Sequence, residues 1–300
     1  MPSWIWIPIT VAAAATQTMR NAFQRGLVEA AGPWGATLVR FLFGLPFALA
    51  WFAAAVVWVD PVGAGWAPDW RGGIIVCALG GFAQVVATAA LMVSMRRGGF
   101  AFGTALQQSS LPLSALVGLA LGDQLGPAGW AGIALATSGL MMLSWPRGGA
   151  GRAGWQAAAY GLASGAAFAV SANAFRSASF ALAPDDPIFA AALTLVIVQA
   201  MQTAGLVAWL SWRDRKALAA AVGGGRSALG AGAFGAAASI GWFTAVALAP
   251  AAAVRAVGVV DMPMAALAGR HFFKERMTLR QIAGAILTAA GVVAIASGWI

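Results

Sequence analysis

The sequence predicts an all-α integral membrane protein whose ten transmembrane helices form two inverted five-helix repeats around a central cavity. Three observations lead to this prediction: the composition, a series of apolar segments and an internal repeat. Of the 300 residues, 61% are hydrophobic and only 9% are charged, whereas about a quarter of the residues are charged in ordinary soluble domains. A soluble chain of this length has too little interior to bury so much apolar surface. The composition therefore predicts a membrane protein.

The second observation is a series of ten apolar segments, each about 18–25 residues long, which is the length that a helix needs to cross a bilayer. The segments are centred on residues 5–25, 34–58, 72–94, 100–119, 128–145, 155–179, 188–211, 227–247, 252–269 and 279–298. Turn residues and charges separate them, in chain order at Gly32-Pro33, Asp60-Pro61, Arg96 to Gly99, Gly122-Asp123, Pro146 to Gly149, Pro184 to Pro187, Arg213 to Lys216, Ala249-Pro250 and Arg270 to Arg276.

The third observation is an internal repeat with an offset of 152 residues, which divides the chain into residues 1–149 and 150–300. The matching positions are Asn21-Ala22-Phe23 with Asn173-Ala174-Phe175, Gly80 with Gly232, Phe82 with Phe234, Asp123 with Glu275, Gly132 with Gly284, and Gly139 with Gly291. Because each unit holds five spans, an odd number, the two units are expected to cross the membrane in opposite directions. Inverted repeats of this kind place the substrate site at their interface, near the bilayer midplane.

The distribution of cations predicts the orientation in the membrane. The odd-numbered connections hold 13 Lys and Arg residues, whereas the even-numbered connections hold Arg71 alone together with acidic residues. Cytoplasmic loops attract Lys and Arg, so both termini are predicted to face away from the cytoplasm. Arg20 and Arg40 are expected near the cytoplasmic side, where an arginine side chain can extend toward the interface.

The ninth segment carries the strongest candidates for coupling or gating. Asp261 lies two residues before Pro263 in the middle of this segment, and Arg255 lies six residues before Asp261. Ionisable residues inside spans are usually functional, and a proline breaks or kinks a helix. We assign a coupling or gating role to Asp261, Arg255 and Pro263, and to Pro112 in the fourth segment. The alternative for Asp261 is a buried ion pair with Arg255 or Arg176.

Polar and aromatic side chains at helical spacing mark the candidate substrate site. Segments one, three, four and eight carry them, and amides and hydroxyls inside a span line a wet cavity or bridge neighbouring helices. Aromatic side chains stack on a ring and can also hold a cation. The assigned substrate-binding residues are Gln17, Asn21, Gln84, Gln107, Ser110, Ser239, Trp242 and Phe243.

Two stretches resemble the closing motif of an EamA-type repeat in the drug/metabolite transporter superfamily. They are KERMTLRQIAGAILTAAGVVAIAS at Lys274 to Ser297 and GDQLGPAGWAGIALATSGLMMLS at Gly122 to Ser144, with Asp123 in place of the usual Glu. Within the superfamily the chain is most similar to the aromatic amino acid exporters of the YddG type. This resemblance implies export of aromatic amino acids across a bacterial inner membrane, with cationic compounds such as methyl viologen as further candidate substrates. In such a membrane the cation count predicts that both termini are periplasmic.

We expect Asp261 to couple export to protons, because burial favours the protonated form of a carboxyl group. A membrane enzyme is disfavoured by the single histidine, the single cysteine and one clear mid-span carboxylate. The lone Cys77 also excludes an intrachain disulfide and a thiolate metal site. Without a GxxxxGK[ST] loop, nucleotide-driven transport is not expected.

Two alternatives stay open: export of other small metabolites, such as threonine, homoserine or cysteine metabolites, and an uncoupled facilitator or channel. The expected partners are a small-molecule substrate and the lipid bilayer. We expect no cofactor, metal or nucleic acid, and a monomer.

Overall fold

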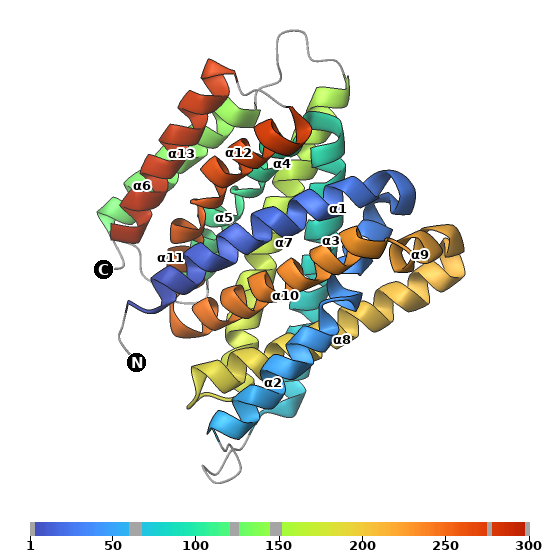
Figure 1. Ribbon diagram of the computed structural model, residues 1–300. Coiled ribbons are helices and arrows are strands. Elements are labelled where there is room, and N and C mark those ends of the chain that lie inside the picture. The colour runs from blue at the N-terminus through green and yellow to red at the C-terminus, as the bar shows by residue number, and fades with distance from the viewer. Residues whose placement is uncertain (1–3, 60–67, 121–125, 145–151, 275–277, 298–300) are drawn as a thin grey trace.

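The computed structural model describes residues 4–59, 68–120, 126–144, 152–274 and 278–297. All regular secondary structure within these ranges is helical (Figure 1), which confirms the predicted all-α class. The helices are α1 (Trp6–Leu42), α2 (Leu45–Val59), α3 (Trp70–Gly98), α4 (Phe100–Gln107), α5 (Ser110–Ala120), α6 (Pro127–Ser144), α7 (Arg152–Leu182), α8 (Pro187–Arg213), α9 (Arg215–Val222), α10 (Gly225–Leu248), α11 (Ala251–Gly258), α12 (Asp261–Phe273) and α13 (Leu279–Ser297).

Five helical stretches of the described chain are long and apolar enough to cross a membrane. They are Trp6–Val59, Trp70–Gly98, Pro187–Arg213, Gly225–Leu248 and Ala251–Phe273. The first contains both α1 and α2 and is 54 residues long, more than twice the roughly 20 residues that one crossing needs. These stretches agree with a membrane protein, and the number of ten crossings stays a prediction.

Each of the ten predicted segments overlaps helical residues, but three of them are divided. Segment 34–58 consists of the end of α1 and all of α2, separated by a turn at Phe43 and Gly44. Segments 100–119 and 252–269 each consist of two short helices, α4 with α5 and α11 with α12. Helix α9 was not predicted and lies where a connection was expected. Its N-cap is Asp214, whose carboxylate accepts a hydrogen bond from the Ala217 backbone N–H at 3.0 Å.

Helix α1 changes direction at Gly32, whose φ of 65° and ψ of 174° are not helical. Glycine adopts this positive φ readily because it has no Cβ atom, and the following Pro33 cannot donate a backbone hydrogen bond. The connection predicted at these two residues is therefore a bend inside α1 and not a loop. The remainder of α1 reaches Leu42 and leads into α2.

Prolines explain the breaks in the two divided helices. Pro112 is the third residue of α5, and Pro263 is the third residue of α12. Neither proline has the N–H that would bond to the carbonyl oxygen four residues before it. Each of these carbonyl oxygens accepts instead from the backbone N–H of the residue just before the proline. Leu111 N donates to Gln108 O at 3.0 Å, and Met262 N donates to Val259 O at 2.8 Å. Each break is thus a tight turn that starts a new helix.

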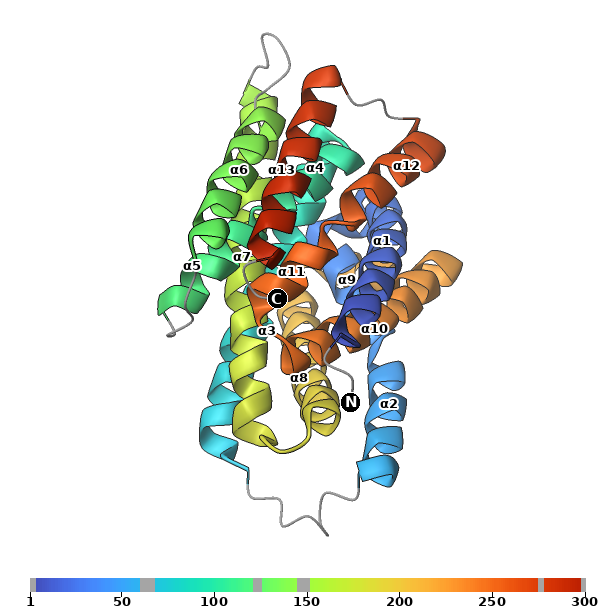
Figure 2. The same cartoon turned by 90° about the vertical axis from the view of Figure 1, so that its left-hand side faces the viewer.

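The packing of the helices is reciprocal under the 152-residue offset. Helix α3 packs along α7, and their repeat counterparts α10 and α1 pack along each other. The two divided helices, α4–α5 and α11–α12, also contact each other. The first half of each contacts the second half of the other, α4 with α12 and α11 with α5. Figures 1 and 2 show α12 between α13 and α1. An exchange of this kind is what a two-fold axis produces.

The α6–α13 pair shows the same reciprocity at the level of single glycines. A Cβ atom on Gly139 would lie 2.6 Å from the Gly284 carbonyl oxygen, and one on Gly291 would lie 2.6 Å from the Gly132 carbonyl oxygen. Gly284 and Gly291 follow Gly132 and Gly139 by the repeat offset. Glycines that let backbones touch are typical of helix interfaces in membranes. The glycine matches in the sequence therefore correspond to one close contact.

Candidate functional site

A narrow cavity lies at the centre of the molecule, among α1, α3, α7, α10 and α11. Its volume of about 20 Å³ is room for about one ordered water. The polar residues that line it are Gln17, Arg40, Gln84, Ser171, Ser239 and Arg255. Its aromatic residues are Phe168, Phe175, Trp242 and Phe243. In this conformation the cavity is too small to hold an amino acid.

Arg40 brings a fully buried guanidinium group to the cavity. Its side chain is only 2% exposed. It donates to Thr88 Oγ1 at 3.1 Å and to Ser239 Oγ at 3.3 Å, which ties α1 to α3 and α10. Thr88 in turn donates to the Gln84 carbonyl oxygen at 2.9 Å. Both partners of Arg40 are neutral hydroxyls, so they hold the group in place and leave its charge uncompensated.

Arg255 lies in the last turn of α11 and faces two aromatic rings. Its guanidinium carbon is 4.8 Å from the ring centre of Trp242 and 5.6 Å from that of Phe168. The side chain is 7% exposed, and its Nε has no hydrogen-bond partner among the residues that the structure describes. A cation over aromatic faces is stabilised by the ring quadrupoles. Because a buried donor without a partner is costly, this nitrogen is a candidate contact for a ligand acceptor.

Asp261 is the first residue of α12 and lies behind the cavity wall. It is 1% exposed. Its Oδ2 accepts from Gln17 Nε2 at 3.2 Å, and its Oδ1 accepts from Gln108 Nε2. Both hydrogen-bond donors to this carboxylate in the described chain are thus amides, not guanidinium groups. The N-terminus of α12 also favours a negative charge at this position.

The alternative considered for Asp261, an ion pair with Arg255 or Arg176, is not found among the described residues, where the two amides hold the carboxylate. Arg255 and Arg20 act on the carboxylate through space as neighbouring charges. Arg176 donates instead to the backbone oxygens of Val246 and Ala249, each at 2.7 Å, near the end of α10. Gln108 belongs to the break between α4 and α5, so its hydrogen bond joins one helix break to the other.

The expectation that Arg20 and Arg40 extend toward the interface is wrong. Arg20 is 1% exposed, and its Nε and Nη2 donate to Asn21 Oδ1 at 3.1 and 2.7 Å. Both arginines pack against Gly235 of α10, where a Cβ atom would lie 3.4 Å from Arg20 Cδ and 3.3 Å from Arg40 Cβ. The missing side chain at Gly235 makes room for two arginines in the interior, which the α1 sequence by itself does not reveal.

The buried groups at the centre carry a net positive charge. Three guanidinium groups, Arg20, Arg40 and Arg255, influence one another electrostatically, and Asp261 is the carboxylate among them. Burying charges of like sign is costly unless an opposite charge is present. The arrangement is therefore suited to a ligand that brings a carboxylate or another anion.

The aromatic side of the cavity is closely packed. The rings of Phe175 and Phe243 are stacked, with centres 4.3 Å apart and planes inclined by 25°. Trp242 lies against Gly258, where a Cβ atom would overlap the far edge of the indole ring. The indole Nε1 is buried and has no hydrogen-bond partner in the described part of the chain. These rings form an apolar surface beside the guanidinium groups.

The structure brings half of the predicted residues to the cavity wall. Gln17, Gln84, Ser239, Trp242, Phe243 and Arg255 line it. The other predicted residues do not line it. Asn21 accepts from Arg20, and Asp261 accepts from Gln17. Pro112 and Pro263 are at the helix breaks, and Pro263 is exposed and lines a separate pocket against α13. Gln107 and Ser110 are buried at the α4–α5 break, and their side-chain polar atoms have no hydrogen-bond partner within the described ranges. The matched acidic pair of the repeat, Asp123 and Glu275, lies outside the described residues.

Besides Ala172 and Val246, four polar or aromatic lining residues were missed by the sequence analysis. Arg40 was placed at the cytoplasmic side, and Phe168, Ser171 and Phe175 were not assigned. The last three follow one another at i, i+3 and i+7 in α7, the spacing of one helix face. That spacing is a signal that could have found them. Nothing in the sequence near Arg40 indicates that its side chain turns inward.

Comparisons with protein-family models and with curated proteins give no match. Among solved structures, 16 chains match. One of them, described only as "Crystal structure of protein", superposes with a TM-score of 0.58 over 96% of this chain and 94% of that chain, at 16% sequence identity. At this identity the similarity establishes a shared fold over nearly the whole chain and no more. The function is therefore inferred from the site itself.

Proposed function

We propose that the protein is a secondary transporter that exports aromatic amino acids across a bacterial inner membrane by alternating access. The observation that carries the proposal is the central cavity, where buried guanidinium groups face aromatic rings at the junction of two reciprocal helical units. A carboxylate and a ring are the two parts of the substrate that such a wall complements.

In this proposal the substrate carboxylate binds Arg40 and Arg255, and its ring enters between Trp242 and the Phe175–Phe243 stack. Gln17 and Gln84 supply acceptor oxygens for the ammonium group, and Asp261 lies directly behind Gln17. An excess of buried positive charge repels a dication. We therefore favour amino acids over cationic compounds such as methyl viologen.

The helix breaks are proposed to provide the movement. Residues 1–149 and 150–300 would each cross the membrane five times in opposite directions, with both chain ends periplasmic, and a monomer holds the whole cavity. Discontinuous helices near the midplane are a common way to build such sites. Because the cavity admits about one water, the two units must separate before a substrate can bind. Labelling of both chain ends by a membrane-impermeant reagent from the periplasm is expected, and labelling from the cytoplasm alone would reject this orientation.

The test is a counterflow assay in proteoliposomes loaded with unlabelled tryptophan. We expect labelled tryptophan to accumulate transiently, with phenylalanine competing strongly, threonine weakly and methyl viologen not at all. Competition by threonine alone would instead favour export of other small metabolites. Downhill flux of tryptophan without counterflow would favour a channel over a carrier. An absence of any tryptophan flux would overturn the proposal.

A further inference from the structure

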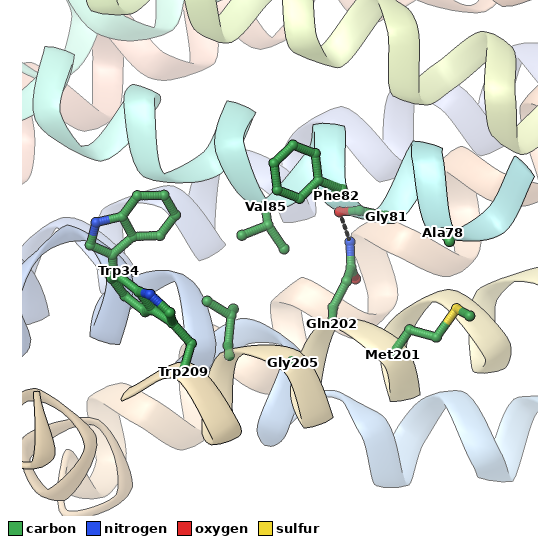
Figure 3. Close-up of a pocket in the computed structure, with 10 residues that line it drawn as sticks. Trp34, Ala78, Gly81, Phe82, Val85, Met201, Gln202, Gly205 and Trp209 are labelled. Carbon is green, nitrogen blue, oxygen red and sulfur yellow. Dashed lines mark hydrogen bonds between the residues drawn. The ribbon is translucent and has the colours of Figure 1, made fainter. Parts of the chain in front are cut away.

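A second, larger hollow lies on the outside of the molecule, between α3 and α8. This outer groove has a volume of about 470 Å³. Its floor contains the small residues Ala78, Gly81 and Gly205, and Phe82 and Met201 form its sides (Figure 3). Phe82 is 71% exposed, so the groove opens outward. On a chain that crosses a membrane, this surface faces lipid.

One end of the outer groove is closed by a pair of aromatic rings. Trp34 and Trp209 meet edge to face, with ring centres 5.1 Å apart. Figure 3 shows this pair at one end of the groove and Met201 with Ala78 at the other. Tryptophan is enriched at the level of the lipid headgroups. The Trp34–Trp209 end therefore marks the headgroup side of the groove.

Exposed cations follow directly beyond that end. Arg213 lies one helical turn after Trp209 on the same face of α8, and Arg215 and Lys216 begin α9. All three side chains are exposed. Asp214 lies between these cations, and its carboxylate caps the N-terminus of α9, where Oδ1 accepts from the Ala217 backbone N–H at 3.0 Å. The end of the groove thus combines an apolar channel with a cluster of positive charge.

The distances fit one leaflet of a bilayer. Met201 and Arg213 are separated by 12 positions in one helix, which is about 18 Å at a rise of about 1.5 Å per residue. The hydrocarbon of one leaflet is about 15 Å thick, half of the roughly 30 Å core. A lipid chain in the groove would therefore place its phosphate at the level of the cations.

We propose that the outer groove binds one anionic phospholipid, with an acyl chain along Gly205 and Phe82 and its phosphate at Arg213, Arg215 and Lys216. The apolar walls select the chain, and the cation cluster selects an anionic over a zwitterionic headgroup. The groove also borders the central site. Gln202 in its floor donates to Gly81 O at 3.0 Å (Figure 3) and to Gln84 Oε1 at 2.8 Å, and Gln84 lines the central cavity.

The experiment counts lipids retained by the full-length protein. The protein is purified from nanodiscs of phosphatidylcholine with phosphatidylglycerol, and native mass spectrometry measures how much of each lipid stays bound. We expect one phosphatidylglycerol to be retained in preference to phosphatidylcholine. Replacing Arg213, Arg215 and Lys216 by Gln is expected to weaken this binding about fivefold per cation, on the order of a hundredfold together. A matched variant with Arg96, Arg270 and Lys274 replaced by Gln, all exposed elsewhere, should retain the lipid.

A second variant tests the acyl-chain part independently of charge. Gly205→Leu fills the groove without a clash, because a Cβ atom at Gly205 meets nothing within 4 Å. Gly26→Leu is the matched control, an exposed helical glycine with equally open space. Gly205→Leu should lose the bound lipid and Gly26→Leu should keep it. Equal retention in these two variants, or equal retention of both lipids by the unaltered protein, would overturn the proposal. Tryptophan counterflow plays no part in either readout.

Discussion

The break between α4 and α5 and the break between α11 and α12 share one backbone plan but differ in chemistry. Each has a proline as the third residue of its second helix and an i→i−3 hydrogen bond across the turn. The first break carries only amides and hydroxyls, at Gln107 to Ser110, whereas Arg255 and Asp261 flank the second. The prolines therefore determine where the two helices are interrupted. The charged residues at the interruptions all lie in the second half of the chain, residues 150–300. The following predictions exploit this difference.

The largest effect is expected for Arg255→Gln, which removes the guanidinium group from the face of Trp242. Truncating one partner of a buried charge pair costs about 2–5 kcal/mol, which is a loss of roughly 30- to 5,000-fold in affinity. Binding of labelled tryptophan to purified protein would measure it. Arg255→Lys keeps the charge and should lose less. An equal loss in Arg226→Gln, an exposed arginine, would contradict a specific role for Arg255.

Gly258→Ala should have the next largest effect. A Cβ atom at this position overlaps the ring of Trp242, so the indole must shift away from Arg255. Overpacking a close contact lowers the free energy of unfolding by about 1–3 kcal/mol, and the displaced indole should also raise the KM for tryptophan. Gly26→Ala introduces the same methyl group into open space and serves as the control. An unchanged KM in Gly258→Ala would show that the position of Trp242 does not matter for binding.

Asp261→Asn tests whether the carboxyl group at the second break, which the first break lacks, makes transport depend on pH. The change keeps the shape and an acceptor oxygen for Gln17 but cannot exchange a proton. If Asp261 couples transport to protons, the variant should lose the pH dependence of export and no longer accumulate substrate against its gradient. Flux in proteoliposomes across a pH series would show this. Ser109→Ala, at the repeat counterpart of Asp261, should leave the pH profile intact, and an identical profile in both variants would refute coupling through Asp261.

The smallest effects are expected for Pro112→Ala and Pro263→Ala. Each restores a backbone N–H that can continue the helix across the break. A proline replacement in a compatible turn changes the free energy of unfolding by about 1 kcal/mol or less, so a small shift in thermal stability is expected in both. Turnover should fall a few-fold in both if the breaks provide the movement. Normal turnover in both variants would place the hinge elsewhere.

Much of the helical layout could be predicted from the sequence because it depends on local features. The length of the apolar segments located the helices, and Pro112 and Pro263 located their breaks. The repeat offset matched Gly132 with Gly284 and Gly139 with Gly291, and only the structure shows that these four glycines lie in one helix contact. The kink in α1 was mistaken for a loop, because a Gly-Pro pair is equally common in a connection.

The interior of the site was harder to predict because it depends on partners far apart in the chain. Arg20 and Arg40 are buried because Gly235, some 200 residues later, leaves space beside them. Gln108 was not assigned, since only the reciprocal crossing of the divided helices brings its amide to Asp261. The spacing of Phe168, Ser171 and Phe175 places them on one face of α7, but the sequence does not distinguish this face from the other apolar helix faces as part of the site. Periodicity identifies a face of a helix, and only tertiary contacts identify what it meets.

The touching glycines of α6 and α13 have a consequence for assembly. Helix α6 contributes Gly132 and Gly139 to this contact, and α13 contributes the matching Gly284 and Gly291. The two contacting surfaces are therefore alike and fit each other. Two identical five-helix subunits could meet along this line without any change of sequence at these positions. In one polypeptide this contact can stay symmetric while other positions differ between the two halves, as Asp261 differs from Ser109 at the repeat offset.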